Sequence, residues 1–152
     1  MKVRWIQFAL TVVCASALTA GVAQTKGIDA ALLAKAQAGD AAAQAQVGEC
    51  YAQGNGVPQS YKQAAVWYLK AANQGNTGAQ GTMGMLYSLG LGVPQSDADA
   101  YFWLDLAAQA PGPSQARYLA NRQNVGTRLT IDELDAIHQR EVKWKAAHPQ
   151  KK

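Results

Sequence analysis

The sequence predicts an all-α protein, a solenoid of repeated helix–turn–helix units, and two observations lead to this class. The chain repeats itself at an offset of 36 residues, and apolar residues recur within each repeat at the spacing of one helix face. Repeats of this length stack so that neighbouring units share one core. The coincidences pair Gly39 with Gly75, Gly48 with Gly84, Tyr51 with Tyr87, Trp67 with Trp103, and Val57-Pro58-Gln59-Ser60 with Val93-Pro94-Gln95-Ser96.

Residues 1–23 have the pattern of a Sec-type signal peptide. Lys2 and Arg4 make a basic start, an apolar run follows over 8–18, and small residues precede a cleavage site near Ala23. The apolar run is shorter than the roughly 20 residues of a spanning helix. We therefore expect a periplasmic or secreted protein with no membrane span in its mature form. Retention of the segment as an anchor is the alternative.

A half repeat over 28–39 precedes the full units, because Asp29 can cap a helix over 30–38 and the segment 35–39 overlays 71–75, the end of the next unit. In each full unit the first helix places its apolar residues at i, i+4, i+7 and i+8, which predicts a buried face. The lone cysteine of the mature chain, Cys50, lies on that face and is expected to be a core residue. The predicted faces are Ala43, Val47, Cys50 and Tyr51 in one unit and Ala79, Met83, Leu86 and Tyr87 in the next.

Glycines mark the middle and the end of each first helix. A glycine inside a helix costs about 1 kcal/mol relative to alanine, so Gly48 and Gly84 indicate helix backbones that pass too close for a side chain. Gly54 and Gly90 suit the left-handed conformation that ends a helix. The following Val-Pro pairs at 57–58 and 93–94 predict an extended step before the next helix.

The second helix of each unit begins at a serine cap. Ser60 with Gln63 has the spacing of a capping box, and Ser96 with Asp99 repeats it more weakly. Trp67 and Trp103 fall on the apolar stripe, so we expect them to be packing anchors between units. The aromatic residues that flank the stripe are candidates for an exposed ligand-stacking role, and they are Tyr61, Tyr101 and Phe102.

The segment 112–148 departs from the repeat. Pro111-Gly112-Pro113 breaks the chain, and Ser114 is expected to start a degenerate repeat helix that runs to about Thr127. A capping box at Thr130 and Glu133 opens a last helix to about Ala147, which suits a terminal cap, and residues 149–152 should fray. The apolar stripe expected for this last helix is Ile131, Leu134, Ile137, Val142 and Trp144.

Charge and chemistry exclude several functions. Loss of Lys2 and Arg4 lowers the formal charge from +4 to +2, and the basic excess lies after residue 110 with alternating signs, which favours a solvated helix face. We expect no nucleic acid binding, because no basic stripe carries stacking aromatics. His138 and His148 lie in the last helix and tail, away from any nucleophile or ligand pattern. We therefore expect no enzyme activity, catalytic residue, metal site or cofactor.

The repeat resembles the Sel1-like repeat, a relative of the tetratricopeptide repeat. The matching motifs are Gly39-Asp-Ala-Ala-Ala-Gln44, Gly48-Glu-Cys-Tyr51, Gly54-Asn-Gly-Val57, Ala64-Ala-Val-Trp-Tyr68 and Lys70-Ala-Ala-Asn-Gln-Gly75, with a second unit from Gly75 through Trp103. The repeats then occupy 24–110, with units at about 40–75 and 76–111. Cys50 and the pair Gly81-Thr82 depart from the usual residue types.

The resemblance implies a right-handed α/α superhelix with a concave face that binds proteins. Bacterial members are commonly adaptors, envelope partners, or immunity proteins that neutralise a secreted toxin. A secreted subgroup is associated with weak β-lactamase activity, but its repeats carry cysteine pairs that this chain lacks. A weak β-lactamase or other cell-wall hydrolase is thus a distant alternative.

We therefore expect a protein–protein interaction module whose partner is another protein, with a cell-wall polymer as the other candidate. The concave wall should come from the first helix of each unit, at positions off the core stripe. The candidate binding residues are Gln46, Glu49, Gln53, Thr82, Met85 and Ser88.

Overall fold

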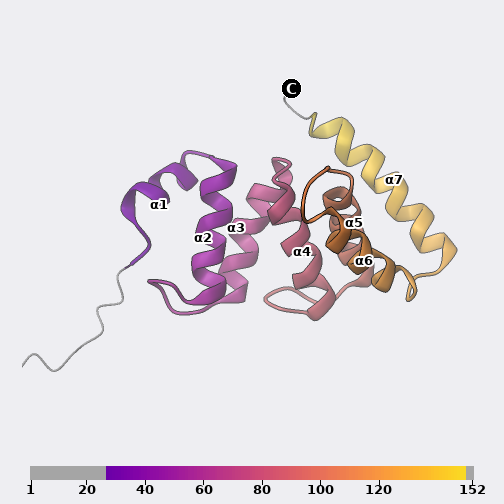
Figure 1. Ribbon diagram of the computed structural model, residues 1–152, viewed down its shortest axis with the longest axis horizontal. Coiled ribbons are helices and arrows are strands. Elements are labelled where there is room, and N and C mark those ends of the chain that lie inside the picture. Colours follow the sequence, from indigo (N-terminus) through magenta and orange to yellow (C-terminus); the bar gives the residue numbers. More distant parts are fainter. Residues whose placement is uncertain (1–26, 150–152) are drawn as a thin grey trace, which may run out of the picture.

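The structure is a computed structural model that describes residues 27–149, and within them it holds seven α-helices and no strand (Figure 1). Helices α1 to α6 follow one another along the long axis and pack in chain order, which confirms the predicted all-α solenoid. The predicted signal peptide and the tail beyond residue 149 lie outside the described residues. The helices are α1 (Ala30–Gln37), α2 (Ala41–Gln53), α3 (Tyr61–Asn73), α4 (Thr77–Leu89), α5 (Asp97–Ala108), α6 (Gln115–Gly126) and α7 (Ile131–Ala147).

Short polar side chains begin most of these helices by accepting a backbone N–H three residues on. The capping box at Thr130 and Glu133 is complete, as predicted. At Ser60 only half of the predicted box forms: its hydroxyl accepts from the Gln63 N–H at 3.3 Å, while no bond returns from the Gln63 side chain. Ser114 stands at the start of α6 but makes no capping bond. The side chains that cap are Asp29, Asp40, Ser60, Asn76, Ser96 and Thr130.

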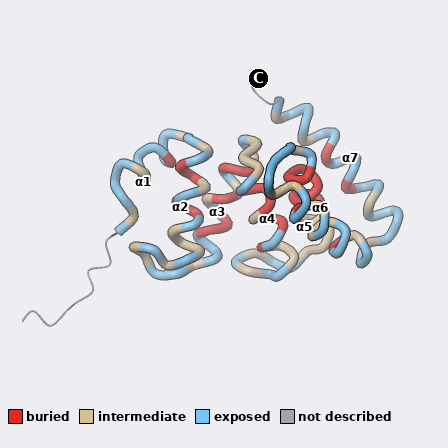
Figure 2. Tube along the Cα trace, viewed as in Figure 1, coloured by how far each residue is buried: buried red, intermediate tan, exposed pale blue. Residues whose placement is uncertain are grey.

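The core follows the predicted stripes through the middle of the solenoid, where the buried residues of α2 to α5 gather (Figure 2). Three expectations need correction. Cys50 is only half-buried, because it lies at the edge of its stripe. Trp67 is also half-buried and packs beside the α1–α2 core, with the Lys70 ammonium 4.4 Å from its ring centre. Phe102 is 1% exposed and is therefore unavailable for stacking on a ligand.

The mid-helix glycines allow close packing, but in two different ways. At Gly84 an added Cβ would lie 2.5 Å from Leu104 Cγ and 3.1 Å from the Ala100 carbonyl oxygen, so the α4 and α5 backbones approach as predicted. At Gly48 the nearest atoms belong to the ring of Tyr68, 3.0 Å away. Close backbone approach is therefore the reason for glycine at Gly84, whereas Gly48 makes room for an aromatic side chain.

A buried glutamine joins each second helix to the first helix that follows it. The side-chain amide of Gln44 donates to the Ala36 carbonyl at 3.1 Å, and that of Gln80 donates to the Ala72 carbonyl at 3.2 Å. Both glutamines are about 5% exposed or less. Gln115 repeats the contact on the Ala108 carbonyl at 3.0 Å, so α6 is the first helix of a third unit.

The last helix, α7, lies obliquely beside the C-terminal half of the solenoid and packs chiefly against α5 (Figure 1). Ile137 is buried as predicted, and Trp144 meets the edges of Trp103 and Phe102 with ring centres 6.1 and 6.4 Å apart. Two residues of the predicted stripe are instead exposed, because α7 turns them outward: Ile131 at 78% and Val142 at 69%. Glu141, which the sequence analysis did not consider, takes a buried position.

Replacement of Gly81 by alanine should destabilise the protein. The ring of Tyr118 from α6 lies directly over Gly81, so an added Cβ would overlap it, which also explains why this position departs from its counterpart Ala45. We expect Gly81→Ala to lower the free energy of unfolding by about 1–3 kcal/mol, measured by urea denaturation.

Gly78→Ala on the same helix is the matched control. Its Cβ would meet nothing closer than Asn76 Oδ1 at 3.5 Å, an ordinary contact. Stability should stay the same or rise by up to about 1 kcal/mol. Equal losses in both variants would contradict the role assigned to Tyr118.

Candidate functional site

The first helices α2, α4 and α6 together build one face of the solenoid, which we call the first-helix face. It carries two hollows. The N-terminal hollow, of about 270 Å³, is lined by Ala45, Gln46, Glu49, Tyr68, Asn76, Gly78, Ala79, Thr82, Arg117 and Tyr118. The C-terminal hollow, of about 150 Å³, is lined by Met85, Ser88, Leu89, Leu104, Asn121, Asn124, Val125 and Arg128.

The structure distributes the six residues expected from the sequence over this face. Gln46, Glu49 and Thr82 line the N-terminal hollow, while Met85 and Ser88 line the C-terminal hollow. Gln53 lines neither hollow. Its amide donates to Glu49 at 2.9 Å and its carbonyl oxygen accepts from Asn55 at 2.6 Å, which holds it at the end of α2.

The N-terminal hollow brings charged and aromatic groups together. Burial, followed by the nearby charge of Glu49, raises the pKa of Tyr68 to about 12, so its hydroxyl stays protonated at neutral pH. Across the hollow the Arg117 guanidinium lies 5.4 Å from the ring centre of Tyr118. The hollow therefore offers an acid, a phenol and a cation to a polar ligand.

The C-terminal hollow combines an apolar floor with a polar rim. Leu104 and Val125 are buried beneath it, while Met85 and Leu89 stand beside it at 42% and 61% exposed. Asn121 and Asn124 supply amide groups at the rim. An apolar side chain of a partner fits such a hollow, with amides placed to bond the main chain next to it.

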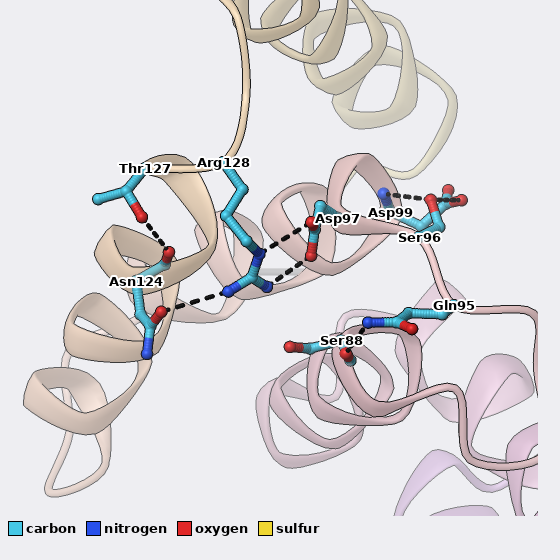
Figure 3. A network of polar contacts seen from close by, with 8 residues as sticks. All are labelled: Ser88, Gln95, Ser96, Asp97, Asp99, Asn124, Thr127 and Arg128. Carbon is cyan, nitrogen blue, oxygen red and sulfur yellow. Dashed lines mark hydrogen bonds and ion pairs between the residues drawn. The ribbon is translucent and has the colours of Figure 1, made fainter.

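Arg128 fixes one edge of the C-terminal hollow (Figure 3). Its guanidinium donates to both carboxylate oxygens of Asp97, at 2.8 and 2.5 Å, and to the Asn124 side chain at 3.3 Å. Hydrogen bonding to Arg128 holds the pKa of Asp97 below its ordinary value. The pair ties the residues just after α6 to the start of α5 at this edge of the hollow.

The residues that the sequence analysis missed come mainly from α6. Arg117, Asn121, Asn124 and Arg128 recur at i, i+4, i+7 and i+11, the spacing of one helix face. Gln115 is the signal that could have revealed them, because it makes the same contact as Gln44 and Gln80. Gln115 stands 35 rather than 36 residues after Gln80, so aligning the sequence with itself at an offset of 36 residues does not pair the two glutamines.

The described residues contain no group of three histidine, cysteine, aspartate or glutamate side chains that could hold a metal ion. Over residues 27–149 we also find no helix with the length and apolar character needed to cross a membrane.

Comparison with known proteins identifies the repeat. Residues 41–76 and 79–111 match the family model of the Sel1 repeat. No curated protein sequence matches the chain.

Two solved structures resemble this one. The first is c5321, a protective antigen present in uropathogenic Escherichia coli strains that displays an SLR fold, with a TM-score of 0.70 and 31% identity over 77% of this chain and 25% of that protein. The second is a Sel1 repeat protein from Oxalobacter formigenes, with a TM-score of 0.56 and 32% identity over 60% of this chain and 35% of that one. The chain thus spans a quarter to about a third of these proteins.

The Asp97–Arg128 pair predicts a pH-dependent effect on stability. Because the pKa of Asp97 is depressed in the folded state, its contribution is present above the unfolded pKa near 3.8 and is lost as the pH falls. Asp97→Asn should lower the Tm by about 1–5 °C at pH 7. The difference from wild type should shrink below about pH 4 and vanish once Asp97 is protonated, as followed by thermal melts. A constant difference at every pH would show that the charge is not involved.

Proposed function

The chain is a Sel1-like repeat protein, and on this premise we propose that it works as an exported protein-binding module whose contact surface is the first-helix face. The repeat fold suggests a protein interaction module. The observation that carries the choice of surface is the C-terminal hollow, where Met85 and Leu89 are exposed beside an apolar floor and a rim of asparagines.

The composition of the first-helix face suits a protein partner. Exposed apolar side chains gain about 25 cal/mol for each Å² that a partner removes from water. The side-chain amides of Gln46, Asn121 and Asn124 can each donate and accept, which matches the peptide groups of a bound chain. Arg117 and Glu49 add opposite charges that fix the orientation of a partner more than its affinity.

Export supports the same proposal from the sequence. If the signal peptide expected over 1–23 directs export, the partner lies in the periplasm or outside the cell. A partner that is a secreted toxin would make the chain an immunity protein, and a partner built into the envelope would make it an adaptor. These are two identities of the partner for one binding surface.

The test is to identify a partner and then locate its contact. The chain with a C-terminal affinity tag serves as bait in periplasmic extract, and cross-linking with mass spectrometry identifies what it holds. The affinity of the purified pair is then measured by calorimetry. Met85→Glu should weaken binding at least tenfold, because it puts a charge into the centre of the apolar contact.

Val66→Glu on α3 is the matched control, since Val66 is 47% exposed but lies on a second helix. It should leave the affinity within about twofold of wild type. Thermal melts confirm that both variants fold. The proposal fails if Val66→Glu weakens binding and Met85→Glu does not.

A further inference from the structure

Two carboxylic acids are buried side by side where α7 meets α5. Asp105 comes from the middle of α5 and is 6% exposed, while Glu141 comes from α7 and is 4% exposed. Acids are almost never fully buried in proteins unless they are paired with a cation. The neighbouring cations are the guanidinium of Arg122 on α6 and the ammonium of Lys145 on α7.

The cations serve the two acids unequally. Asp105 forms an ion pair with Arg122 and accepts from the Gln109 amide at 2.8 Å. Glu141 has only the Lys145 ammonium, 3.8 Å from Oε2, and its Oε1 has no hydrogen-bond partner. The Arg122 guanidinium pairs with Asp105 through Nη1, and its Nε is buried without a partner, so it makes no hydrogen bond to Glu141. The second acid is left without a full counter-charge.

A buried acid next to an ionised acid holds its proton. Burial, and then the charge of Asp105, raise the pKa of Glu141 from 4.5 to about 8. Burial opposes ionisation of Asp105 as well, but its bonds to Arg122 and Gln109 outweigh it and lower the pKa of Asp105. With α7 seated, Asp105 on α5 is therefore ionised and Glu141 on α7 is neutral.

The rest of the contact between α7 and the solenoid is small. Ile137 is its one other buried residue. Arg140 pairs with Asp99 at 2.6 Å in a half-exposed position, where an ion pair contributes little. Trp144 donates from Nε1 to Asn73 at a long 3.4 Å. The aromatic contacts are those of Trp144 with Trp103 and Phe102 and of the Arg140 guanidinium, 4.0 Å from the Phe102 ring centre. These are the contacts that must hold the helix if Glu141 becomes charged.

We propose that α7 is a proton-controlled latch, which is seated on α5 while Glu141 is protonated and comes away when Glu141 ionises, uncovering Phe102 and Trp103. These two side chains are 1% and 3% exposed beneath the seated helix and would form an aromatic patch on α5 once α7 leaves. The proposal does not depend on the function assigned to the first-helix face.

The raised pKa of Glu141 sets the direction in which pH changes the seating of α7. Because the pKa of Glu141 is raised in the seated state, the seated helix is favoured fully below pH 4.5 and progressively less as the pH rises to about 8. Each pH unit in this window changes the seating equilibrium by up to about tenfold.

The other titratable groups that face the latch come from α5, α6 and α7 itself. The bond between Asp105 and Arg122 lowers the pKa of the acid and raises that of the guanidinium, so both stay charged, and burial raises the pKa of Tyr101 so that it stays neutral. Arg140 pairs with Asp99, and Lys145 lies beside Glu141. His138 lies edge-on to Tyr101 at 6.3 Å, and His148 stacks on Trp144 at 4.5 Å. Both histidines are therefore included as controls.

The test measures how often α7 opens, by thiol labelling of the full chain at two α7 positions in separate variants. Ile137→Cys reports opening because Ile137 is buried, and Val142→Cys reports the unhindered rate because Val142 is 69% exposed. Peptide mass spectrometry reads each position, so Cys14 and Cys50 do not interfere. The ratio of the first rate to the second cancels the pH dependence of the thiol itself. It should rise by up to about tenfold per unit between about pH 5.5 and pH 7.5.

Four further variants test whether Glu141 causes the pH dependence of the labelling ratio. In Glu141→Gln the ratio should stay constant with pH, because the amide mimics the protonated acid. Asp135→Asn, which removes an exposed acid of the same helix, should keep the wild-type slope, as should His138→Gln and His148→Gln. A flat ratio in the wild type, a slope that survives Glu141→Gln, or a slope lost in either histidine variant overturns the proposal.

A second measurement avoids the cysteine at position 137. Hydrogen exchange of α7 amides, corrected for the intrinsic rate, should speed up relative to α5 amides over the same pH range in the wild type and not in Glu141→Gln. Equal behaviour of the two proteins would overturn the latch even if Ile137→Cys had unseated the helix by itself.

Discussion

The architecture depends on a glutamine amide that recurs at each junction between units, buried at Gln44 and Gln80 and half-buried at Gln115. Gln44, Gln80 and Gln115 each donate to a carbonyl near the end of the preceding second helix. A buried amide without its acceptor costs about 1–3 kcal/mol. If a first helix shifted by one residue against the preceding unit, this bond would be lost. The bond therefore fixes how each first helix packs against the unit before it. The first-helix face exists because three junctions repeat the same geometry.

The parts that sequence reasoning predicted are those set by nearby residues. Asp29 and Thr130 cap the helices that follow them, and Gly54 and Gly90 end first helices with φ of 74° and 67°, because each contact spans only a few positions. The buried stripes could also be predicted from the sequence, because helical periodicity shows which positions share a face. Periodicity predicts that Cys50 and Trp67 are more deeply buried than the structure shows, because it gives the direction of a side chain and not how far its neighbours cover it.

The position of α7 could not be predicted in the same way. Its stripe predicts that Ile131 and Val142 are buried, yet the helix buries Glu141 instead. Asp105, which lies beside Glu141, is more than 15 residues away in sequence and meets it only in the fold. Only half of the candidate site could be predicted from the sequence, for a similar reason. The positions on α2 and α4 followed from the repeat, whereas those on α6 were hidden by a single-residue change in the repeat length. The chain thus presents a regular face built by its junctions and an irregular last helix held by a buried acid.

The claim that the first-helix face is the working surface can be tested most directly by a hydrogen-exchange footprint of the chain bound to its identified partner. The account predicts slower exchange along α2, α4 and α6 on binding, strongest around the hollow lined by Met85 and Asn124, with α1 and α3 unchanged. Protection confined to α3, α5 and α7 would contradict it, because the partner would then sit on the second helices and leave the first-helix face open to solvent.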